Sequence, residues 1–362
     1  MTAAAPASFV YTGLPGRVVF GAGTLAQARA ELQRLGVTRA LVLTTPAQVE
    51  QGRALVERLG DRAAGAFHGA AMHTPVAVTN EALAAFRQRS ADGVVAIGGG
   101  STIGLGKAIA VRTGAPQLAI PTTYAGSEMT PILGETEAGA KTTRRSLDIL
   151  PEAVIYDVEL TLGLPAALSG TSGMNAMAHA VEALYAQDAN PITSLMAEQG
   201  IAALARALPA IAAEPGDRAA RSDALYGAWL CGVCLGTVGM ALHHKLCHVL
   251  GGSFDMPHSE THTVVLPHAV AYNAAAAPDA MARIARALGT PGAATASAAA
   301  GLYQLAGAIG APRSLAALGL PADALDRAAD LAVANPYWNP RPLERAAIRD
   351  LLERAYTGAP PP

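Results

Sequence analysis

The sequence predicts an α/β protein whose N-terminal half is a parallel sheet covered by helices on both faces, followed by an all-helical C-terminal half. Up to residue 157, apolar strand-like segments alternate with amphipathic helix-like segments. Some of these segments, such as ALVLTT (40–45), are apolar throughout, which is typical of strands buried on both faces. From about Thr161 onward the pattern is helical, interrupted by Gly and Pro. A chain of 362 residues is long enough for two cores, so we expect domains at 1–158 and 159–362.

The elements of the first domain follow from its apolar pattern in chain order. We expect strands at 17–22, 40–45, 64–69, the segment before Gly98, 118–123 and 153–157. The helices between them are expected at 24–35, about 46–59, about 77–90, and after the glycines that begin at Gly98. Regular alternation of strand and helix predicts a parallel sheet with helices on both faces. Residues 124–150, rich in Gly, Thr and charge, are interpreted as an excursion over the sheet edge.

One segment is apolar enough to require a membrane test. Residues 224–242 (ALYGAWLCGVCLGTVGMAL) carry no charge over 19 positions, which is nominally long enough to span a bilayer. The segment runs directly into His243, His244 and Lys245 and has no flanking anchors. Its several glycines indicate close helix neighbours. We therefore interpret it as a core helix of the second domain and expect no membrane association.

Charge and cysteine content exclude several classes of protein. The formal net charge is −2 with no basic block, so nucleic acid is not an expected partner. Three cysteines make an odd count, and the N-terminus lacks the basic-then-apolar pattern of a secretion signal. Both features predict a location in the reducing cytoplasm. The C-x-x-C at Cys231 has no second pair nearby, which argues against a zinc or redox motif.

A glycine turn and a threonine pair predict a dinucleotide site. Gly98, Gly99, Gly100, Ser101 and Thr102 lie between a strand and a helix, where free N–H groups and the helix dipole favour a pyrophosphate. The turn is not a G-x-G-x-x-G motif, and a glycine turn with a purely structural role would have the same sequence pattern. Thr122 and Thr123 follow the next strand, at the carboxyl edge where such sheets bind ligands. Together the two features favour a dinucleotide.

Histidines concentrate in one stretch of the second domain. Six of the nine lie within residues 241–268, at His243, His244, His248, His258, His262 and His268. His244 and His248 share a helix face, with Cβ atoms roughly 5–6 Å apart, as do Asn175 and His179 on an upstream helix.

We expect Gly251 and Gly252 to break the first helix and Pro257 to rigidify the approach to His258. Imidazoles converging from two helices suit metal ligation or proton transfer. The alternative is that these histidines only fill polar gaps between helices.

The motifs GGGSTIGLGKAIA, PTTYAGSEMTP, SGMNAMAHAVEALYA and HHKLCHVLGGSFDMPH resemble, in order and spacing, those of the iron-containing alcohol dehydrogenase superfamily. The details are most similar to its maleylacetate reductase branch, over essentially the whole chain. The resemblance implies a dehydroquinate synthase-like architecture, with catalysis in a cleft between a nucleotide-binding and a helical domain. The metal-binding members use an aspartate and three histidines. Those positions fall at Asn175, His179, His244 and His258, and His248 matches a further catalytic histidine.

Three departures from the metal-dependent pattern matter. Asn175 stands in place of the aspartate, and Gly104 stands where the GGGS-x-x-D pattern has its acid. Thr44 and Thr45 end the second strand, where NAD-preferring relatives carry an aspartate for the ribose. The departures predict that both NADH and NADPH serve and that no metal is required. If a metal is bound, its candidate ligands are His179, His244 and His258.

The resemblance implies reduction of the carbon–carbon double bond of 2-maleylacetate to 3-oxoadipate, in aromatic-compound degradation. The expected catalytic residues are His244, His248, His179, His258, Lys245 and Asn175, with Lys245 binding a carboxylate of the dianionic substrate. Arg144, Arg145 and Arg341 are weaker candidates for that role. The expected cofactor-binding residues are Gly98, Gly99, Gly100, Ser101, Thr102, Thr122, Thr123, Ser127, Lys141 and Thr44. A homodimer is expected from the resemblance alone.

Three alternatives remain open at this point. A metal-dependent alcohol dehydrogenase of the same superfamily would act on a small alcohol or aldehyde. A lyase of the dehydroquinate synthase type shares the general fold and uses NAD transiently. A non-catalytic nucleotide-binding protein would leave the histidines without a role. NADH consumption with maleylacetate, with simple aldehydes and without substrate distinguishes them.

Overall fold

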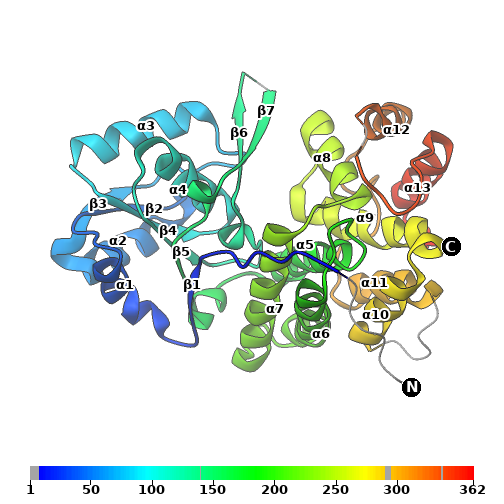
Figure 1. Cartoon of the computed structure of the whole chain (residues 1–362), viewed down its shortest axis with the longest axis horizontal. Helices are drawn as coiled ribbons and strands as arrows, with labels where there is room; N and C mark the ends of the chain where they lie inside the picture. Colours follow the sequence, from blue (N-terminus) through cyan, green and yellow to red (C-terminus); the bar gives the residue numbers. More distant parts are fainter. Residues whose placement is uncertain (1–7, 139, 290–294, 336) are drawn as a thin grey trace. The chain divides into compact units, whose positions relative to one another are not determined.

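The structure, a computed structural model, describes residues 8–138, 140–289, 295–335 and 337–362. The chain divides into two compact units (Figure 1): the sheet unit, Leu14–Leu164, and the helical unit, which begins at Pro165 and also takes in the residues before Leu14. The division falls a few residues after the expected boundary at 158. One reason is that Asp157, just beyond the last strand, accepts hydrogen bonds from the backbone N–H groups of Gly23 and Leu25 and so ties the next turn to the sheet unit.

The sheet unit is built on six parallel strands in the order β1-β8-β5-β4-β2-β3. They are β1 (Arg17–Phe20), β2 (Ala40–Leu43), β3 (Ala63–Phe67), β4 (Gly93–Gly98), β5 (Gln117–Pro121) and β8 (Ala153–Tyr156). The predicted parallel α/β class is therefore confirmed. Several strands end earlier than their apolar runs. In β1, for example, Gly21 has φ +142° and leaves the strand conformation.

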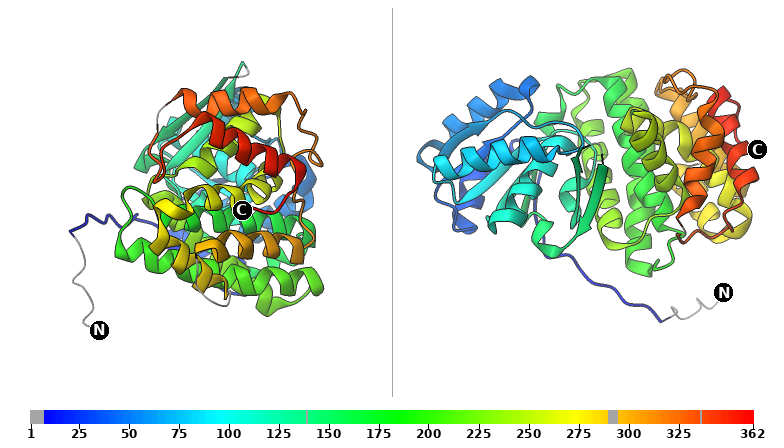
Figure 2. Two further views of the ribbon diagram at one scale, coloured as in Figure 1. Left: turned by 90° about the vertical axis from the view of Figure 1, so that its right-hand side faces the viewer. Right: turned by 90° about the horizontal axis from the view of Figure 1, so that it is seen from above.

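Helices cover both faces of this sheet, as the alternation predicts (Figures 1 and 2). On one face lie α1 (Ala28–Arg34) and α2 (Val49–Leu59), and on the other α3 (Val76–Gln88) and α4 (Gly100–Thr113). Neighbouring residues of β2 point to opposite faces, so Val42 packs with the first pair and Leu41 with the second. The expected helices 24–35 and 46–59 both begin as short 3-10 helices, Thr24–Gln27 and Pro46–Gln48.

The excursion expected at 124–150 contains a hairpin that the sequence did not reveal. Strands β6 (Ile132–Glu137) and β7 (Ala140–Arg145) form a separate two-stranded antiparallel sheet. Among the side chains of these strands that the structure describes, Leu133 is the buried apolar one, and it packs against Ala108 and Ile149. Because most other residues of the two strands are polar, their pattern lacks the apolar alternation by which strands are identified.

The helical unit contains nine α-helices among the described residues. They are α5 (Ala166–Ala183), α6 (Pro191–Ala213), α7 (Arg218–Thr237), α8 (Leu242–Phe254), α9 (His258–Asn273), α10 (Pro278–Leu288), α11 (Thr295–Ala308), α12 (Ala324–Ala334) and α13 (Arg345–Thr357). Helices α5, α6 and α7 pack against one another, and α9 packs against both α5 and α8 (Figure 2). This packing brings the histidine-bearing helices side by side.

Two helix boundaries differ from expectation. The helix expected at 224–242 is α7, which begins at Arg218 and ends at Thr237. The turn before α8 is fixed by distant acids: Asp188 accepts from the N–H of Gly239, and Glu182 from that of Ala241.

The break expected at Gly251 and Gly252 is wrong, because α8 continues through both to Phe254. Glycine costs a helix only about 1 kcal/mol relative to alanine, which packing of α8 offsets. Asp255, with φ +51°, ends the helix instead.

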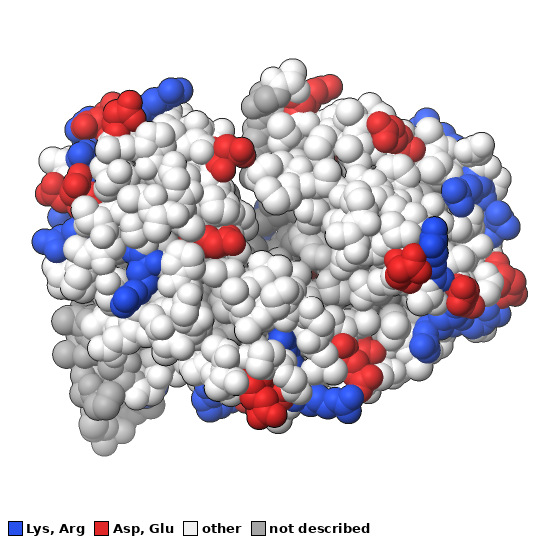
Figure 3. Space-filling model, turned by 180° about the vertical axis from the view of Figure 1, so that it is seen from behind, with Lys and Arg blue, Asp and Glu red and all other residues white. Residues whose placement is uncertain are grey.

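No single helix among the described residues is long and apolar enough to cross a membrane. Helices α7 and α8 meet the length and composition criteria only when taken together, and they meet at a bend of 94°. On the face drawn in Figure 3, acidic and basic side chains of the described residues are intermixed. This mixture of charges on that face agrees with the absence of a basic block in the sequence.

Candidate active site

The glycine turn follows β4 and forms the start of α4. β4 and β5 are paired so that Gly98 lies opposite Pro121, and the N–H of Thr122 donates to the carbonyl of Gly98. Gly98 has φ +153°, and a Cβ there would come within 2.5 Å of the Thr102 hydroxyl. A Cβ on Gly99 would lie 3.1 Å from the Thr123 methyl group. Glycine is therefore required for this close approach of backbone and threonines.

This turn has the features of an anion site. Gly99 is the N-cap residue of α4, and no side chain caps the helix. The first N–H groups of a helix have no intrahelical partners, and the helix dipole favours negative charge there. β2 and β4 are neighbours whose connections run to opposite faces of the sheet, so the turn lies at a topological switch point, where such folds bind ligands. The residues present fit the pyrophosphate of a dinucleotide.

Thr44 and Thr122, which are also expected to bind the cofactor, form side-chain hydrogen bonds near this turn. The Thr44 side chain is buried, and its hydroxyl is 2.7 Å from His68 Nδ1. Gln48, which the sequence did not single out, donates through Nε2 to the Thr122 hydroxyl at 3.3 Å. It lies in the turn after β2, and only the pairing of strands reveals its proximity to Thr122.

Ser127 is held in place by a buried lysine. Lys107 Nζ donates to the Ser127 carbonyl, to the Thr130 hydroxyl at 2.9 Å and to the Ile132 carbonyl at 2.9 Å. Burial lowers the pKa of Lys107 to about 7, and the nearby charge of Glu128 opposes this shift. Lys107 thus fixes the segment between β5 and β6.

Lys141 and Gly104, two further positions named from the sequence, also lie in the sheet unit. Lys141 lies on β7, and its side chain is outside the described residues. A Cβ on Gly104 would approach the Thr74 hydroxyl to 2.4 Å. The acid that metal-dependent relatives carry at this position would not fit here unless Thr74 moved.

In the helical unit, α5, α8 and α9 bring four imidazoles into one buried cluster. His179 of α5 lies with its ring centroid 5.1 Å from that of His244 of α8. The His262 ring of α9 is 5.1 Å from His244 and 4.9 Å from His243. None of the four side chains is more than 5% exposed. The structure therefore brings His179 and His244 together, as expected, and adds His243 and His262.

A buried carboxylate anchors this cluster, and the sequence reading missed it. Glu182 is fully buried, and its Oε2 lies 2.7 Å from His244 Nδ1. Its oxygens also accept from the backbone N–H groups of Ala241 and His243, at 2.9 and 2.8 Å. Glu182 thus caps α8, whose N-cap residue offers no side chain, and orients His244. A lone acid one turn after His179, in an otherwise apolar helix, was the available signal.

Burial sets the protonation of the remaining buried imidazoles. Desolvation, followed by the charges of neighbouring histidines, holds the pKa values of His179, His243 and His262 well below the ordinary value of 6.5. These three rings are therefore neutral at pH 7. His244 differs from these three rings because, of the four, it is the one whose side chain bonds to a carboxylate.

The other expected catalytic residues lie at the margin of the cluster. His248 and His258 are exposed, and His258 lies with its ring 4.4 Å from that of His262. Asn175 is buried, and its Oδ1 has no hydrogen-bond partner within the described structure. Lys245 is half-buried, with Nζ 5.5 Å from the Tyr337 ring centroid.

The arginines proposed for the substrate occupy other surroundings. Arg341 stacks on the Tyr272 ring at 4.1 Å and donates to the Tyr272 carbonyl. Arg144 and Arg145 are exposed on β7 of the sheet unit. Lys245 is therefore the only one of the four candidate cations that neighbours His244 in the chain.

Comparison with known proteins shows the family to which the chain belongs. Residues 15–158 match the iron-containing alcohol dehydrogenase family, and residues 169–356 match the C-terminal part of the same family. The chain is 60% identical to a maleylacetate reductase of Rhizobium sp. (strain MTP-10005), over 98% of this chain and 99% of the relative. It is 57% identical to a maleylacetate reductase of Burkholderia cepacia over the same shares.

Solved structures give the same result. The crystal structure of a maleylacetate reductase from Agrobacterium tumefaciens superposes with a TM-score of 0.94, at 60% identity over 98% of this chain and all of that one. An iron-containing alcohol dehydrogenase from Corynebacterium glutamicum superposes with a TM-score of 0.92 at 40% identity, over 98% of both chains. The chain belongs to the iron-containing alcohol dehydrogenase family and, within it, groups with the maleylacetate reductases.

Proposed function

We propose that this chain reduces the carbon–carbon double bond of 2-maleylacetate to 3-oxoadipate with NADH or NADPH, in the degradation of aromatic compounds. The observation that carries the proposal is its 60% identity, over nearly full length, to a maleylacetate reductase. The chain is accordingly an oxidoreductase that acts on a CH–CH group. The buried cluster around His244 and Glu182 supplies the groups that this chemistry needs.

The reaction adds a hydride to the alkene carbon conjugated with the ketone, places negative charge on the ketone oxygen, and ends with a proton on the adjacent carbon. When bound, NADH or NADPH supplies the hydride with its electron pair. The turn at Gly98–Gly100 and the first N–H groups of α4 bind the pyrophosphate. Thr122 and Thr123 line the same edge of the sheet.

His244 is proposed to stabilise the oxyanion and to supply the proton. With Nδ1–H donating to Glu182, Nε2 of the neutral ring is an acceptor, and in the imidazolium form it carries the N–H that donates to the substrate. Nε2 is buried and has no partner within the described structure. A buried imidazolium at this position is offset by the Glu182 carboxylate.

The remaining members of the expected catalytic set serve as further substrate ligands and proton donors. His248 and His258 are exposed and suited to exchange protons with solvent. His179 and Asn175 are buried on α5 and offer neutral hydrogen-bonding groups. Lys245 is proposed to bind a carboxylate of the dianionic substrate, because it follows His244 directly and carries the needed charge.

The family name raises the question of iron, and the residues present do not fit it. The set Asn175, His179, His244 and His258 contains no anionic donor to offset a divalent cation. Among the described residues, the His, Cys, Asp and Glu ligand atoms that gather within 4.8 Å belong to another trio. We propose that catalysis needs no metal.

Two further features belong to the proposal. We propose a cytoplasmic location, supported by three buried free cysteines, because a reducing compartment keeps thiols reduced. A homodimer is proposed from the resemblance to the family. Sedimentation at micromolar concentration tests it, and a single species near 36.7 kDa would contradict it.

The assay for the function compares three reactions. NADH oxidation is followed with maleylacetate, with small aldehydes in the presence of iron or zinc, and without substrate. We expect turnover with maleylacetate and 3-oxoadipate as the product, identified by mass spectrometry. Faster turnover of an aldehyde in the presence of a metal would instead support the metal-dependent alcohol dehydrogenase.

A further inference from the structure

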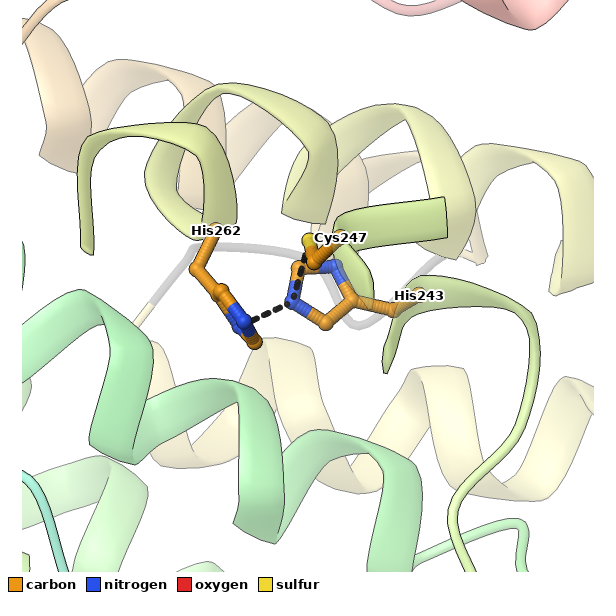
Figure 4. Close-up of side chains that lie close together, drawn as sticks. All are labelled: His243, Cys247 and His262. Carbon is orange, nitrogen blue, oxygen red and sulfur yellow. Dashed lines mark hydrogen bonds between the residues drawn. The ribbon is translucent and has the colours of Figure 1, made fainter. Parts of the chain in front are cut away.

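Deeper than His244, three ligating atoms meet between α8 and α9 (Figure 4). His243 Nε2 lies 3.0 Å from His262 Nδ1 and 3.7 Å from Cys247 Sγ, and all three atoms are within 4.8 Å of one another. We propose that His243, Cys247 and His262, called here the buried trio, bind a thiophilic divalent cation of the zinc class. The trio shares no residue with the proposed catalytic set.

The distances are close to those of a tetrahedral zinc site. Zinc binds imidazole nitrogen at about 2.0–2.1 Å and thiolate sulfur at about 2.3 Å. At tetrahedral angles, these bond lengths place two nitrogens about 3.3–3.4 Å apart and a nitrogen and a sulfur about 3.6 Å apart. The observed 3.0 and 3.7 Å require shifts of only a few tenths of an ångström, and His262 Nδ1 and Cys247 Sγ, which lie within 4.8 Å of each other, have to approach to about the same nitrogen–sulfur distance.

The trio is held by well-anchored helices. His243 and Cys247 are four residues apart on α8, so they present their ligating atoms on one face. His262 comes from α9, which packs against α8. The start of α8 is fixed where Glu182 accepts from the His243 N–H. Sites on anchored helices keep their ligands in place.

Charge also favours a divalent cation at this position. Cys247 contributes one negative charge to the metal directly, as a thiolate. The set Asn175, His179, His244 and His258 contains no ligand that carries a negative charge, so a soft cation is expected at the trio instead.

Binding moves two protons. Burial and the charge of Glu182 raise the pKa of the Cys247 thiol, so the cation has to displace the thiol proton as its bond to sulfur forms. The Cys247 thiol releases its proton to solvent as the metal–sulfur bond forms. The proton between the two imidazoles moves, so that His243 carries its N–H at Nδ1 and His262 at Nε2. Both of these nitrogens are buried and have no hydrogen-bond partner within the described structure. No oxidation or reduction is involved.

The test titrates the metal-free, full-length protein with Co²⁺ and then displaces the cobalt with Zn²⁺. Because the trio is at most 2% exposed, each addition is left to equilibrate for hours. We expect one equivalent of Co²⁺ to give a thiolate-to-cobalt charge-transfer band. Cys247→Ser should lose this band and weaken zinc binding at least about a hundredfold.

Two control variants separate the trio from other metal sites. Cys234→Ser removes another buried thiol, on α7, and should leave the band intact. His258→Asn alters the metal position of the family and should also leave it intact. Absence of stoichiometric binding by the wild-type chain would overturn the proposal, as would loss of the band in either control.

A measurement on the wild-type chain covers the case in which Cys247→Ser fails to fold. Zinc should slow alkylation of Cys247, read by peptide mass spectrometry, at least about tenfold. Cys231 and Cys234 in the same sample are internal controls whose rates should not change. Equal rates for Cys247 with and without zinc would refute the site. None of these readouts depends on the proposed enzymatic activity.

Discussion

Glu182 Oε2 lies 2.7 Å from His244 Nδ1, and the same carboxylate accepts from the backbone N–H groups of Ala241 and His243. One buried acid therefore both begins α8 and sets the orientation of the imidazole that follows. A carboxylate behind a histidine fixes its tautomer and aims the other ring nitrogen. Of the four buried rings in the cluster, His244 is the one whose side chain bonds to a carboxylate.

Replacing Glu182 with Gln should lower kcat about 10–100-fold with a smaller change in KM. The amide has only one oxygen, so it loses the bond from the N–H of either His243 or Ala241, and it presents N–H₂, or an uncharged oxygen, to His244. Steady-state kinetics and the pH dependence of kcat measure the effect. Glu198→Gln, which removes a partly exposed partner of Arg283 and Arg286, is the matched control. Wild-type kcat in Glu182→Gln would disprove the assignment.

Replacing Lys245 with Met should raise KM for maleylacetate about tenfold or more and change kcat by less than about threefold. The lysine is proposed to bind a substrate carboxylate equally in the ground and transition states, so its loss weakens binding only. Arg286→Met removes an exposed cation of the same unit and should change neither constant. An unchanged KM in a folded Lys245→Met protein would rule out the role.

NADH and NADPH should both serve as reductants, with kcat/KM values within about a hundredfold of each other. At the end of β2, Thr44 and Thr45 stand where a carboxylate would repel a 2′-phosphate, and the Thr44 hydroxyl is bonded to His68. Parallel titrations of the two cofactors at saturating maleylacetate measure the ratio. A preference for NADH greater than a hundredfold would count against this prediction.

Exhaustive chelation should leave activity intact. Asn175 contributes no charge to the family's metal position, and a protonated His244 can stabilise the developing oxyanion. Metal content is measured by inductively coupled plasma mass spectrometry on the sample that is assayed. Removal of a cation from the buried trio would not alter this result, since the trio is outside the proposed chemistry. Loss of activity that iron or zinc restores would refute a metal-free mechanism.

Stability should fall as the pH drops from about 6.5 to 4, partly because of His268. Burial, with a smaller contribution from the Arg354 charge, lowers the pKa of His268 to about 4. Between this pH and the ordinary pKa of 6.5, the unfolded chain binds a proton that the folded chain does not, so acid favours unfolding.

Thermal melts at pH 7 and pH 5 test this prediction. The difference between the two melting temperatures should be smaller in His268→Leu than in the wild type. His73→Asn, at an exposed position, should behave like the wild type. An identical pH dependence in His268→Leu would exclude a contribution from His268.

The parallel sheet, the position of the glycine turn and the helical nature of the second half could all be predicted from the sequence. These features depend on local sequence. A strand buried on both faces is apolar along its length. A positive φ favours glycine, and Gly98 has such a φ. The hairpin β6–β7 was missed because its strands are polar and only Leu133 is anchored. Local composition therefore predicted the buried strands of the sheet but not the hairpin, which is anchored through Leu133.

The full set of histidines around His244 depends on how the helices pack. Spacing and resemblance grouped His244 with His248 and His179, and the crossing of α5, α8 and α9 adds His243 and His262 to this group. Glu182 contacts His244, which lies 62 positions later in the sequence. Glu182 and Asp188 also accept hydrogen bonds from the turn that interrupts residues 224–242, which were expected to form one helix. Such contacts depend on helix packing at long range, which a periodic pattern along one chain segment does not specify.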